Sequence, residues 1–171
     1  MIQSKLKQIQ LLLLDVDGVL TDGRITYASG NVEAKSFNVK DGFGIRLLQS
    51  AGVQIGIVTG RTSESLLRRC EDLGITLIYD GVKDKGKLLP TILSATGFKI
   101  QEVAFVGDDL PDIPLLKKVG LSIAVADAHD LVKKNADMVT IKKGGHGAVR
   151  EICEQILEAK DLWAKIVTTW A

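Results

Sequence analysis

The chain has 171 residues, of which 46% are hydrophobic and 25% are charged, and its 22 Lys and Arg against 21 Asp and Glu leave a formal net charge of +1. At this length folding buries roughly 70% of the surface that the unfolded chain exposes, so we expect a single domain over residues 1–171. The balanced charge argues against nucleic-acid binding, which draws its affinity from an excess of Lys and Arg. The two cysteines, Cys70 and Cys153, form no CxxC pair, which excludes a disulfide scaffold and a zinc finger.

The N-terminal segment contains one short apolar run. This run, Leu11 to Leu14, is followed at once by an acidic residue. It is too short for the hydrophobic part of a signal peptide and for a membrane span. We therefore expect a globular, cytoplasmic protein that does not enter a membrane.

Several short runs are apolar at consecutive positions, which is typical of strands covered on both faces. They are Ile9–Leu14, Val53–Val58, Thr76–Tyr79, Val103–Val106, Ser122–Val125 and Met138–Ile141. Between them lie stretches with apolar residues at helical spacing that end at Gly74, Gly97 and Gly120, as helix C-termini commonly do. This alternation predicts an α/β fold with a doubly wound, mostly parallel sheet, whose ligands bind at the carboxyl ends of the strands.

Two segments depart from this alternation. Arg24–Phe37 places apolar residues on either side of a turn at Ser29-Gly30-Asn31, which predicts a β-hairpin flap directly after the first strand. From Ala148 onward, apolar residues recur at the spacing of a helix with one buried face, over about residues 148–170. Trp163 and Trp170 in this helix are expected to pack against the core or a subunit interface.

The first strand runs out into two carboxylates. Asp15 follows Leu14 directly, and Asp17 comes two positions later, within the sequence DVDGVLTDG. A solvated strand end with turn-forming Asp and Gly would explain this motif if it stood alone.

A second acidic cluster changes that interpretation. Asp108, Asp109 and Asp112 follow the Val103–Val106 run in the sequence GDDLPD. Two parallel strands that both end in acids bring those acids to one edge of the sheet, where their repulsion is tolerable only with a cation among them. Carboxylate oxygens and water are the ligands that Mg²⁺ prefers, so the sequence predicts a Mg²⁺ site.

Donor groups for an anion lie at the ends of two further strands. Thr59, Gly60 and Arg61 follow the run that ends at Val58, and Lys85 lies shortly past the next run. A hydroxyl, backbone amides, an ammonium and a guanidinium are suited to phosphoryl oxygens. We therefore expect a phosphate group held by these donors and bridged through Mg²⁺ to the carboxylates.

The order DxDGVLTDG, TGR, a lysine and GDDxxD resembles the haloacid dehalogenase superfamily of phosphatases, over nearly the whole chain. The resemblance implies that Asp15 is a nucleophile that forms an aspartyl-phosphate. Asp17 would protonate the leaving alkoxide and then deprotonate the hydrolytic water, while Thr59 and Lys85 bind the transferring phosphoryl group. The implied metal ligands are Asp15, the backbone carbonyl of Asp17 and Asp108, with Asp109 and Asp112 close to the metal as supporting groups.

Only the hairpin separates the first motif from FNVKDGFGIR at residues 37–46, so the cap domain of many superfamily members is missing. FNVKDGFGIR, TGR, VADAH at residues 125–129 and GGHGAVRE at residues 144–151 are similar to a capless family, the 3-deoxy-D-manno-octulosonate 8-phosphate phosphatases. That resemblance implies a Mg²⁺-dependent enzyme that releases free octulosonate (Kdo) for lipopolysaccharide biosynthesis. It also implies a homo-oligomer, a homotetramer in which the hairpins pack together.

The same resemblance implies substrate contacts, in part across subunits. The residues concerned are Asp17, Asn38, Val39, Lys40, Asp41, Gly42, Arg46, Thr59, Gly60, Arg61, Arg69 and Lys85. Lys40 stands where many relatives carry an arginine; it keeps the charge but not the bidentate fork. Arg69, at helical spacing, is either a substrate contact or part of a solvated helix face.

Two other functions remain open. A phospho-acceptor receiver domain also combines an acidic Mg²⁺ site with a Thr and a Lys, but its acceptor does not lie on the first strand with a second acid two positions on. A phosphatase of a nonulosonate (sialic-acid-type) 9-phosphate is the nearer alternative. Arg61 and GGHGAVRE favour the octulosonate phosphate.

The histidines and cysteines are expected to have no catalytic part. The carboxylates already supply acid–base groups, so His129 and His146 are assigned to helix capping or to the surface. Cys70 and Cys153 fall on apolar helix faces, where a buried thiol behaves as a small hydrophobe.

Overall fold

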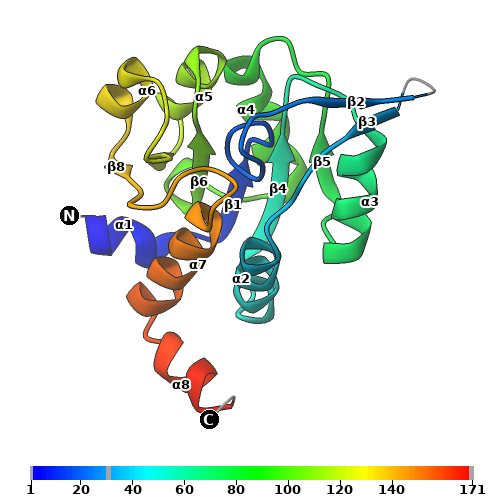
Figure 1. Cartoon of the computed structure of the whole chain (residues 1–171). Coiled ribbons are helices and arrows are strands. Elements are labelled where there is room, and N and C mark those ends of the chain that lie inside the picture. The colour runs from blue at the N-terminus through cyan, green and yellow to red at the C-terminus, as the bar shows by residue number, and fades with distance from the viewer. Residues whose placement is uncertain (1, 30–31, 170–171) are drawn as a thin grey trace.

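The computed structural model describes residues 2–29 and 32–169. Its centre is a six-stranded sheet in the order β5-β4-β1-β6-β7-β8, in which every neighbouring pair is parallel (Figure 1). The strands are β1 (Leu11–Leu14), β4 (Gln54–Val58), β5 (Leu77–Tyr79), β6 (Val103–Gly107), β7 (Leu121–Ala124) and β8 (Met138–Val139). Each overlaps one of the apolar runs, and the predicted doubly wound α/β sheet is confirmed.

The register aligns the ends of the three central strands. Leu14 of β1 pairs with Ile57 of β4 and with Val106 of β6. These strands are buried at every position except Gln54, and burying a Leu, Ile or Val side chain contributes roughly 1.5–3 kcal/mol. The residues that follow each strand therefore leave a rigid core at the same edge of the sheet.

Helices cover both faces of this sheet. α1 (Ile2–Gln8), α2 (Val39–Ser50) and α7 (Ala148–Ala159) pack together on the face nearer the viewer in Figure 1. α4 (Lys85–Thr96) and α5 (Ile113–Leu116) pack together on the other face. The remaining helices and 3-10 turns are α3 (Glu64–Leu73), η1 (Ile100–Glu102), η2 (Leu110–Asp112), α6 (Asp130–Asn135) and α8 (Trp163–Thr168).

Glycine ends two of the three helices that the sequence predicts to stop at one. α3 stops at Gly74 and α4 at Gly97, with left-handed φ angles of 66° and 75°. The prediction of a helix ending at Gly120 is wrong, because α5 stops after Leu116. The N–H of Gly120 instead donates to carbonyls of η1 and β6 at 3.0 and 3.1 Å, which leads the chain straight into β7.

The single C-terminal helix predicted from the sequence is two helices, α7 and α8. α7 ends in a Schellman motif, in which the N–H of Asp161 donates to Glu158 and the N–H of Leu162 donates to Leu157, both at 2.9 Å. Asp161 adopts the left-handed φ of 61° that this motif requires. The apolar spacing continues across the break, so it could not reveal a local cap.

α1, α2 and α6 were not predicted. α1 and α6 are short, and α2 contains two glycines that weaken its helical signal. α2 begins at Asn38, whose side chain accepts from the N–H of Lys40 at 2.9 Å. It buries Ile45 and Leu48 in the core, and such packing stabilises helices more than propensity does.

The hairpin flap consists of β2 (Thr26–Ala28) and the antiparallel β3 (Val32–Ala34), with Tyr27 opposite Glu33. It projects from the edge where the strands of the main sheet end (Figure 1). Of the predicted turn, Gly30 and Asn31 lie outside the described residues, as does Trp170. Between β1 and α2 the described chain holds no helix or strand besides β2 and β3, so no cap domain is evident there.

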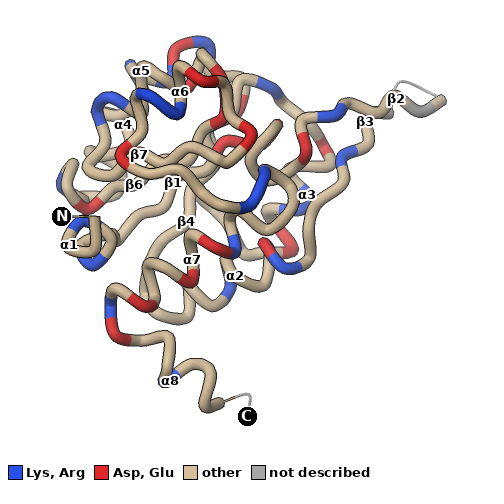
Figure 2. Tube along the Cα trace, turned by 60° about the vertical axis from the view of Figure 1, so that its left-hand side comes forward, with Lys and Arg blue, Asp and Glu red and all other residues tan. Residues whose placement is uncertain are grey.

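The helices and charges of the described chain show two further features. No helix within residues 2–29 and 32–169 combines the length and the apolar character that crossing a membrane requires. Figure 2 shows Lys and Arg interspersed with Asp and Glu along the trace. The near-neutral net charge therefore reflects mixing of the two signs rather than separate basic and acidic halves.

Candidate active site

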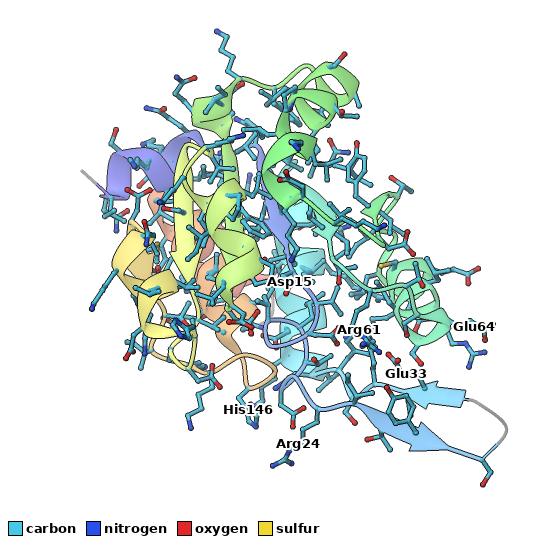
Figure 3. The ribbon with its side chains drawn as sticks, turned by 90° about the horizontal axis from the view of Figure 1, so that it is seen from above. Asp15, Arg24, Glu33, Arg61, Glu64 and His146 are labelled. Atoms are coloured by element: carbon cyan, nitrogen blue, oxygen red, sulfur yellow. The ribbon has the colours of Figure 1, made fainter. Side chains whose placement is uncertain are left out.

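The residues that follow the strands line one pocket at the carboxyl edge of the sheet (Figure 3), with a volume of about 350 Å³. Its lining includes Asp15, Asp17, Thr59, Gly60, Arg61, Lys85, Asp108, Asp109 and Asp112. These residues meet because β1 lies between β4 and β6 and because α4 begins at Lys85. All the residues predicted as catalytic or close to the metal are therefore in one place.

Asp15 and Lys85 form a buried ion pair. The N–H of Asp15 donates to the carbonyl of Val106 at 3.1 Å, which continues the strand pairing one residue beyond β1. Lys85 Nζ lies 2.8 Å from Asp15 Oδ1 and 2.6 Å from Asp112 Oδ1, and the three side chains are almost fully buried. Burial alone would lower the pKa of Lys85, but the charges of Asp15 and Asp112 outweigh it and raise that pKa. Lys85 therefore stays protonated between the two acids.

Burial and mutual repulsion disfavour the charges of the neighbouring acids. Burial is the largest cause that raises the pKa of Asp15 to about 6, against the opposing effect of Lys85. Burial and then the charge of Asp15 raise the pKa of Asp108 to about 8. Carboxylate oxygens of Asp15, Asp108 and Asp112 lie within 4.8 Å of one another. One ammonium group cannot balance three carboxylates, and carboxylate oxygens gathered in this way fit a hard divalent cation.

Gly18 makes room for the acid cluster. Its φ of 91° lies in the left-handed region, which a residue with a Cβ adopts only with strain. A Cβ at this position would also lie 2.0 Å from Oδ2 of Asp108. The glycine that follows Asp17 thus serves both the turn after β1 and the approach of Asp108.

Asp112 and Asp109 organise the loop after β6. Asp112 is 1% exposed, and its Oδ2 accepts from the N–H groups of Asp108 and Asp109 at 2.9 and 3.2 Å. Its Oδ1 accepts from Lys85, so both oxygens already have donors. Asp109 caps η2, with its Oδ1 accepting from the N–H of Leu110 at 2.8 Å. These contacts favour supporting positions for both residues over direct metal ligation.

Thr59 is fixed by backbone contacts on both sides. Its N–H donates to the carbonyl of Tyr79 at 2.9 Å, and its carbonyl accepts from the N–H of Val82 at 3.0 Å. The residue is 2% exposed, yet it lines the pocket, and its hydroxyl accepts from the N–H of Arg61 at 3.4 Å. The backbone therefore fixes Thr59 in the pocket lining.

Asp17 belongs to a ring of four charged side chains that joins the pocket to the hairpin. Lys35 forms ion pairs with Asp17 and, at 3.0 Å, with Glu33. Arg61 Nη2 lies 2.6 Å from Glu33 Oε2, and its Nε lies 3.7 Å from Asp17 Oδ2. Figure 3 shows Glu33 and Arg61 near each other beside the hairpin. We call these four residues, Asp17, Lys35, Glu33 and Arg61, the charge ring.

Glu33 and Lys35 were missed from the sequence. They stand two positions apart, which places both side chains on one face of an extended segment, and they carry opposite charges in a hairpin that directly follows the first motif. This pair of opposite charges was the signal in the sequence from which the two residues could have been found. Their pairing with Asp17 and Arg61 depends on how the hairpin lies over the pocket, which is a tertiary contact.

A second group of predicted substrate residues lies at the N-cap of α2, on α2 and on α3, and does not line this pocket. Its members are Asn38, Val39, Lys40, Asp41, Gly42, Arg46 and Arg69. Asn38 caps α2 and donates from Nδ2 to the carbonyl of Gly145 at 3.1 Å. Asp41 is 1% exposed, and its Oδ1 accepts from the N–H of Arg150 at 2.8 Å, so in this chain it anchors the start of α7.

Arg69 and Arg46 differ in their surroundings. Arg69 donates from Nη2 to the carbonyl of Asn38 at 3.3 Å and fills the space beside Gly42, where a Cβ would lie 2.2 Å from that nitrogen. It lines a neighbouring pocket of about 750 Å³ between the hairpin and α3. Arg46 is exposed and donates to the carbonyl of Asp72 at 2.6 Å.

The histidines and cysteines lie where the sequence suggested. His129 caps α6, with its side chain accepting from the N–H of Leu131 at 3.1 Å. His146 is exposed, and its Nδ1 lies 2.8 Å from a carbonyl of its own loop. Cys70 and Cys153 are buried and unpaired, and burial raises the pKa of both thiols. Neither cysteine has the low pKa that a nucleophilic thiolate needs.

Comparison with known proteins agrees with this geometry. The family model of haloacid dehalogenase-like hydrolases matches residues 76–152. The chain is 46% identical over 157 residues to the 3-deoxy-D-manno-octulosonate 8-phosphate phosphatase KdsC of Escherichia coli strain K12, covering 92% of this chain and 84% of that protein. It is 47% identical over 153 residues to the KdsC of Yersinia pestis, covering 90% and 82%.

Solved structures show the same architecture. The 3-deoxy-D-manno-octulosonate 8-phosphate phosphatase of Moraxella catarrhalis, in complex with magnesium ion, phosphate ion and KDO, superposes with a TM-score of 0.97 at 39% identity, covering 99% of this chain and 98% of that one. The cobalt-bound enzyme of Haemophilus influenzae gives a TM-score of 0.93 at 39% identity, covering 97% of each chain. The chain therefore belongs to the haloacid dehalogenase-like hydrolases and, within them, to the family of 3-deoxy-D-manno-octulosonate 8-phosphate phosphatases.

Proposed function

We propose that this protein hydrolyses 3-deoxy-D-manno-octulosonate 8-phosphate to free octulosonate and phosphate, with Mg²⁺, as a step in lipopolysaccharide biosynthesis. The observation that carries the proposal is the buried Asp15 carboxylate, held 2.8 Å from Lys85 among the acids that end β1 and β6. Relatives at 46% and 47% identity bear the name of this activity.

Asp15, Asp108 and the backbone carbonyl of Asp17 are the proposed ligands of Mg²⁺. The fit rests on the carboxylate oxygens of Asp15 and Asp108, which lie close together, and on the raised pKa values of these two acids, whose charges need a further cation. When bound, Mg²⁺ neutralises negative charge on the carboxylates and on the phosphate. Asp109 and Asp112 support the loop that carries Asp108.

In the proposed reaction, an oxygen of Asp15 attacks phosphorus while the bond from phosphorus to the sugar oxygen breaks, which leaves an aspartyl-phosphate. Asp17 gives its proton to the departing alkoxide. Asp17 then takes a proton from water, whose oxygen attacks the same phosphorus and releases phosphate from Asp15. The Thr59 hydroxyl and the Lys85 ammonium bind phosphoryl oxygens as negative charge moves between them.

The residues around α2 are proposed to complete the substrate site, in part across subunits. The hairpin presents strand edges, and Tyr27 on it is 74% exposed, so pairing hairpins from several copies would cover both. We propose a closed homotetramer in which Asn38, Val39, Lys40, Gly42, Arg46 and Arg69 face substrate and Asp41 holds α2 against α7. Buried, unpaired cysteines are usual in a reducing compartment, and a cytoplasmic location is proposed.

A panel of phosphate esters tests the substrate. Phosphate release is measured with Mg²⁺ for the octulosonate 8-phosphate, a nonulosonate 9-phosphate and mannose 6-phosphate, at matched concentrations. The proposal expects the highest kcat/KM for the octulosonate 8-phosphate. A higher value for the nonulosonate ester would reassign the substrate, and persistent phosphorylation without turnover would indicate a receiver-like domain; neither alternative is favoured by the relatives that match the chain.

A further inference from the structure

The charge ring lies where two pockets adjoin. Asp17 and Arg61 line the catalytic pocket, whereas Glu33 and Lys35 line the larger pocket between the hairpin and α3. Because the four side chains contact one another, they form the wall between the pockets. A substrate whose phosphate sits beside Asp15 and whose sugar extends toward α3 must pass this wall.

Two carboxylates of the ring each contact both of its cations, Asp17 from the catalytic pocket and Glu33 from the larger pocket. Glu33 Oε2 lies 2.6 Å from Arg61 and Glu33 Oε1 lies 3.0 Å from Lys35. Hydrogen bonds from Lys35 and Arg61 lower the pKa of Glu33, so it is ionised at neutral pH. The Lys35 side chain is 1% exposed and would keep only Asp17 as an ion-pair partner if Glu33 left, and removing one partner of a buried ion pair is costly. A ligand that takes the place of Glu33 is therefore favoured when it brings a carboxylate of its own.

The main chain at Glu33 is held by contacts that do not involve its carboxylate. Its backbone carbonyl accepts from the hydroxyl of Ser65 at 2.9 Å, and the residue is paired with Tyr27 across the hairpin. These contacts hold the main chain against α3 independently of the carboxylate. The side chain is 19% exposed, so part of it already meets solvent.

We propose that Glu33 is a specificity-determining residue, an internal counterion of Arg61 and Lys35 that the carboxylate of a sugar-acid phosphate replaces. This inference rests on the proposed sugar-acid substrate. A sugar acid exchanges its carboxylate for that of Glu33 and keeps both cations paired. A sugar phosphate without a carboxylate leaves Glu33 in place and meets cations that are already neutralised. Selectivity thus comes from competition between two carboxylates for one site.

The test is the variant Glu33→Gln, which keeps the size of the side chain and removes its charge. The KM for the octulosonate 8-phosphate should fall by about three- to tenfold, because the competing carboxylate is gone, while kcat stays within about twofold. The KM for mannose 6-phosphate should change by less than about twofold. Inhibition by free octulosonate, which has the carboxylate without the phosphate, should strengthen by the same factor as the fall in KM.

Glu71→Gln is the matched control. Glu71 is exposed on α3 and lines neither of the two pockets, so its variant should behave as the wild type with both esters. Glu33→Asp, whose shorter side chain cannot span both cations, should give a smaller shift in the same direction as Glu33→Gln. Circular dichroism establishes that each variant is folded, and Glu33→Asp carries the test if Glu33→Gln is not.

The outcomes separate this inference from the proposed function. A wild-type enzyme with no preference for the octulosonate ester over mannose 6-phosphate overturns the proposed function. A wild type with that preference, combined with a Glu33→Gln variant whose KM rises or changes equally for both esters, overturns the role of Glu33. A KM that rises in the variant would make Glu33 a direct substrate contact. A KM that changes equally for both esters would make Glu33 only a structural part of the hairpin.

Discussion

The ammonium group of Lys85 lies 2.8 Å from Oδ1 of Asp15 at the carboxyl end of β1. The same ammonium lies 2.6 Å from Asp112, so Lys85 is shared between two buried acids. This arrangement holds the proposed nucleophile in one orientation but leaves the cluster with more negative than positive charge. An arriving phosphate group must therefore compete for Lys85, and the cluster needs a further cation before it accepts a second anion.

The variant Asp15→Asn should lower phosphate release by at least about 10³-fold, because an amide cannot attack phosphorus. In the metal-free protein the same variant should raise the Tm, since burial and neighbouring acids disfavour the Asp15 charge. Phosphate assays and thermal unfolding followed by circular dichroism measure the two effects. Turnover near the wild-type rate would show that another residue is the nucleophile.

In the metal-free protein, the free energy of unfolding should fall as the pH rises. The pKa values of Asp15 and Asp108, about 6 and about 8 in the folded protein, exceed the unfolded value of about 3.9. The folded state therefore binds more protons than the unfolded state between about pH 4 and 8, and the stability present at acid pH is lost through that range.

Thermal unfolding with and without Mg²⁺ measures this effect. The Tm of the metal-free protein should be lower at about pH 8 than at about pH 5.5. Carboxylates with a lowered pKa, such as Asp137, are already ionised at about pH 5.5, so they do not titrate between these two pH values. Mg²⁺ should raise the Tm more at the higher pH, because it binds the ionised cluster. Equal Mg²⁺ effects at both pH values would contradict the assigned cluster.

The variant Asp41→Ala should destabilise the protein by about 1–3 kcal/mol, because it leaves the N–H of Arg150 at the start of α7 without its acceptor. Asp41→Asn is the matched control. An amide oxygen can still accept from Arg150, and burial raises the pKa of Asp41, so the neutral side chain should be tolerated. Denaturant unfolding measures both; an Asn variant as unstable as the Ala variant would mean that the charge itself is needed.

Replacing residues 26–34 by a short Gly-Ser loop should give a smaller species in light scattering, because the hairpins are proposed to join the subunits. The variant also lacks Glu33 and the edges of β2 and β3, which are proposed to close one side of the substrate site. Its activity should fall more for the octulosonate 8-phosphate than for p-nitrophenyl phosphate, which needs only the catalytic pocket. A fully active monomer, whether parent or variant, would contradict the proposed assembly.

The sheet and its acid cluster could be predicted because both depend on local sequence. Runs such as Leu11–Leu14 are apolar on both faces, and the acids stand directly after them. The break at Asp161 could not be predicted, because a Schellman motif interrupts a helix without interrupting its apolar spacing. The charge ring was also hidden, since Lys35 reaches Asp17 only through the fold of the hairpin.

The surroundings of Asp41 show the same limit at the site. FNVKDGFGIR was interpreted as a substrate-binding segment from its resemblance to a family, yet the segment begins a helix whose Asp41 is buried against α7. Sequence places such a residue near a motif, but only packing decides whether its side chain meets solvent or another helix. The other members of the segment remain a proposal for the assembled protein.

Trapping of the covalent intermediate tests the central claim most directly. Enzyme, Mg²⁺ and octulosonate 8-phosphate are mixed and quenched during turnover, and borohydride then reduces any aspartyl-phosphate to homoserine, which peptide mass spectrometry locates. Homoserine should appear at Asp15 with this substrate, and not when the substrate or Mg²⁺ is left out. The account would be contradicted if the enzyme releases phosphate from octulosonate 8-phosphate while homoserine appears at another aspartate position and not at Asp15.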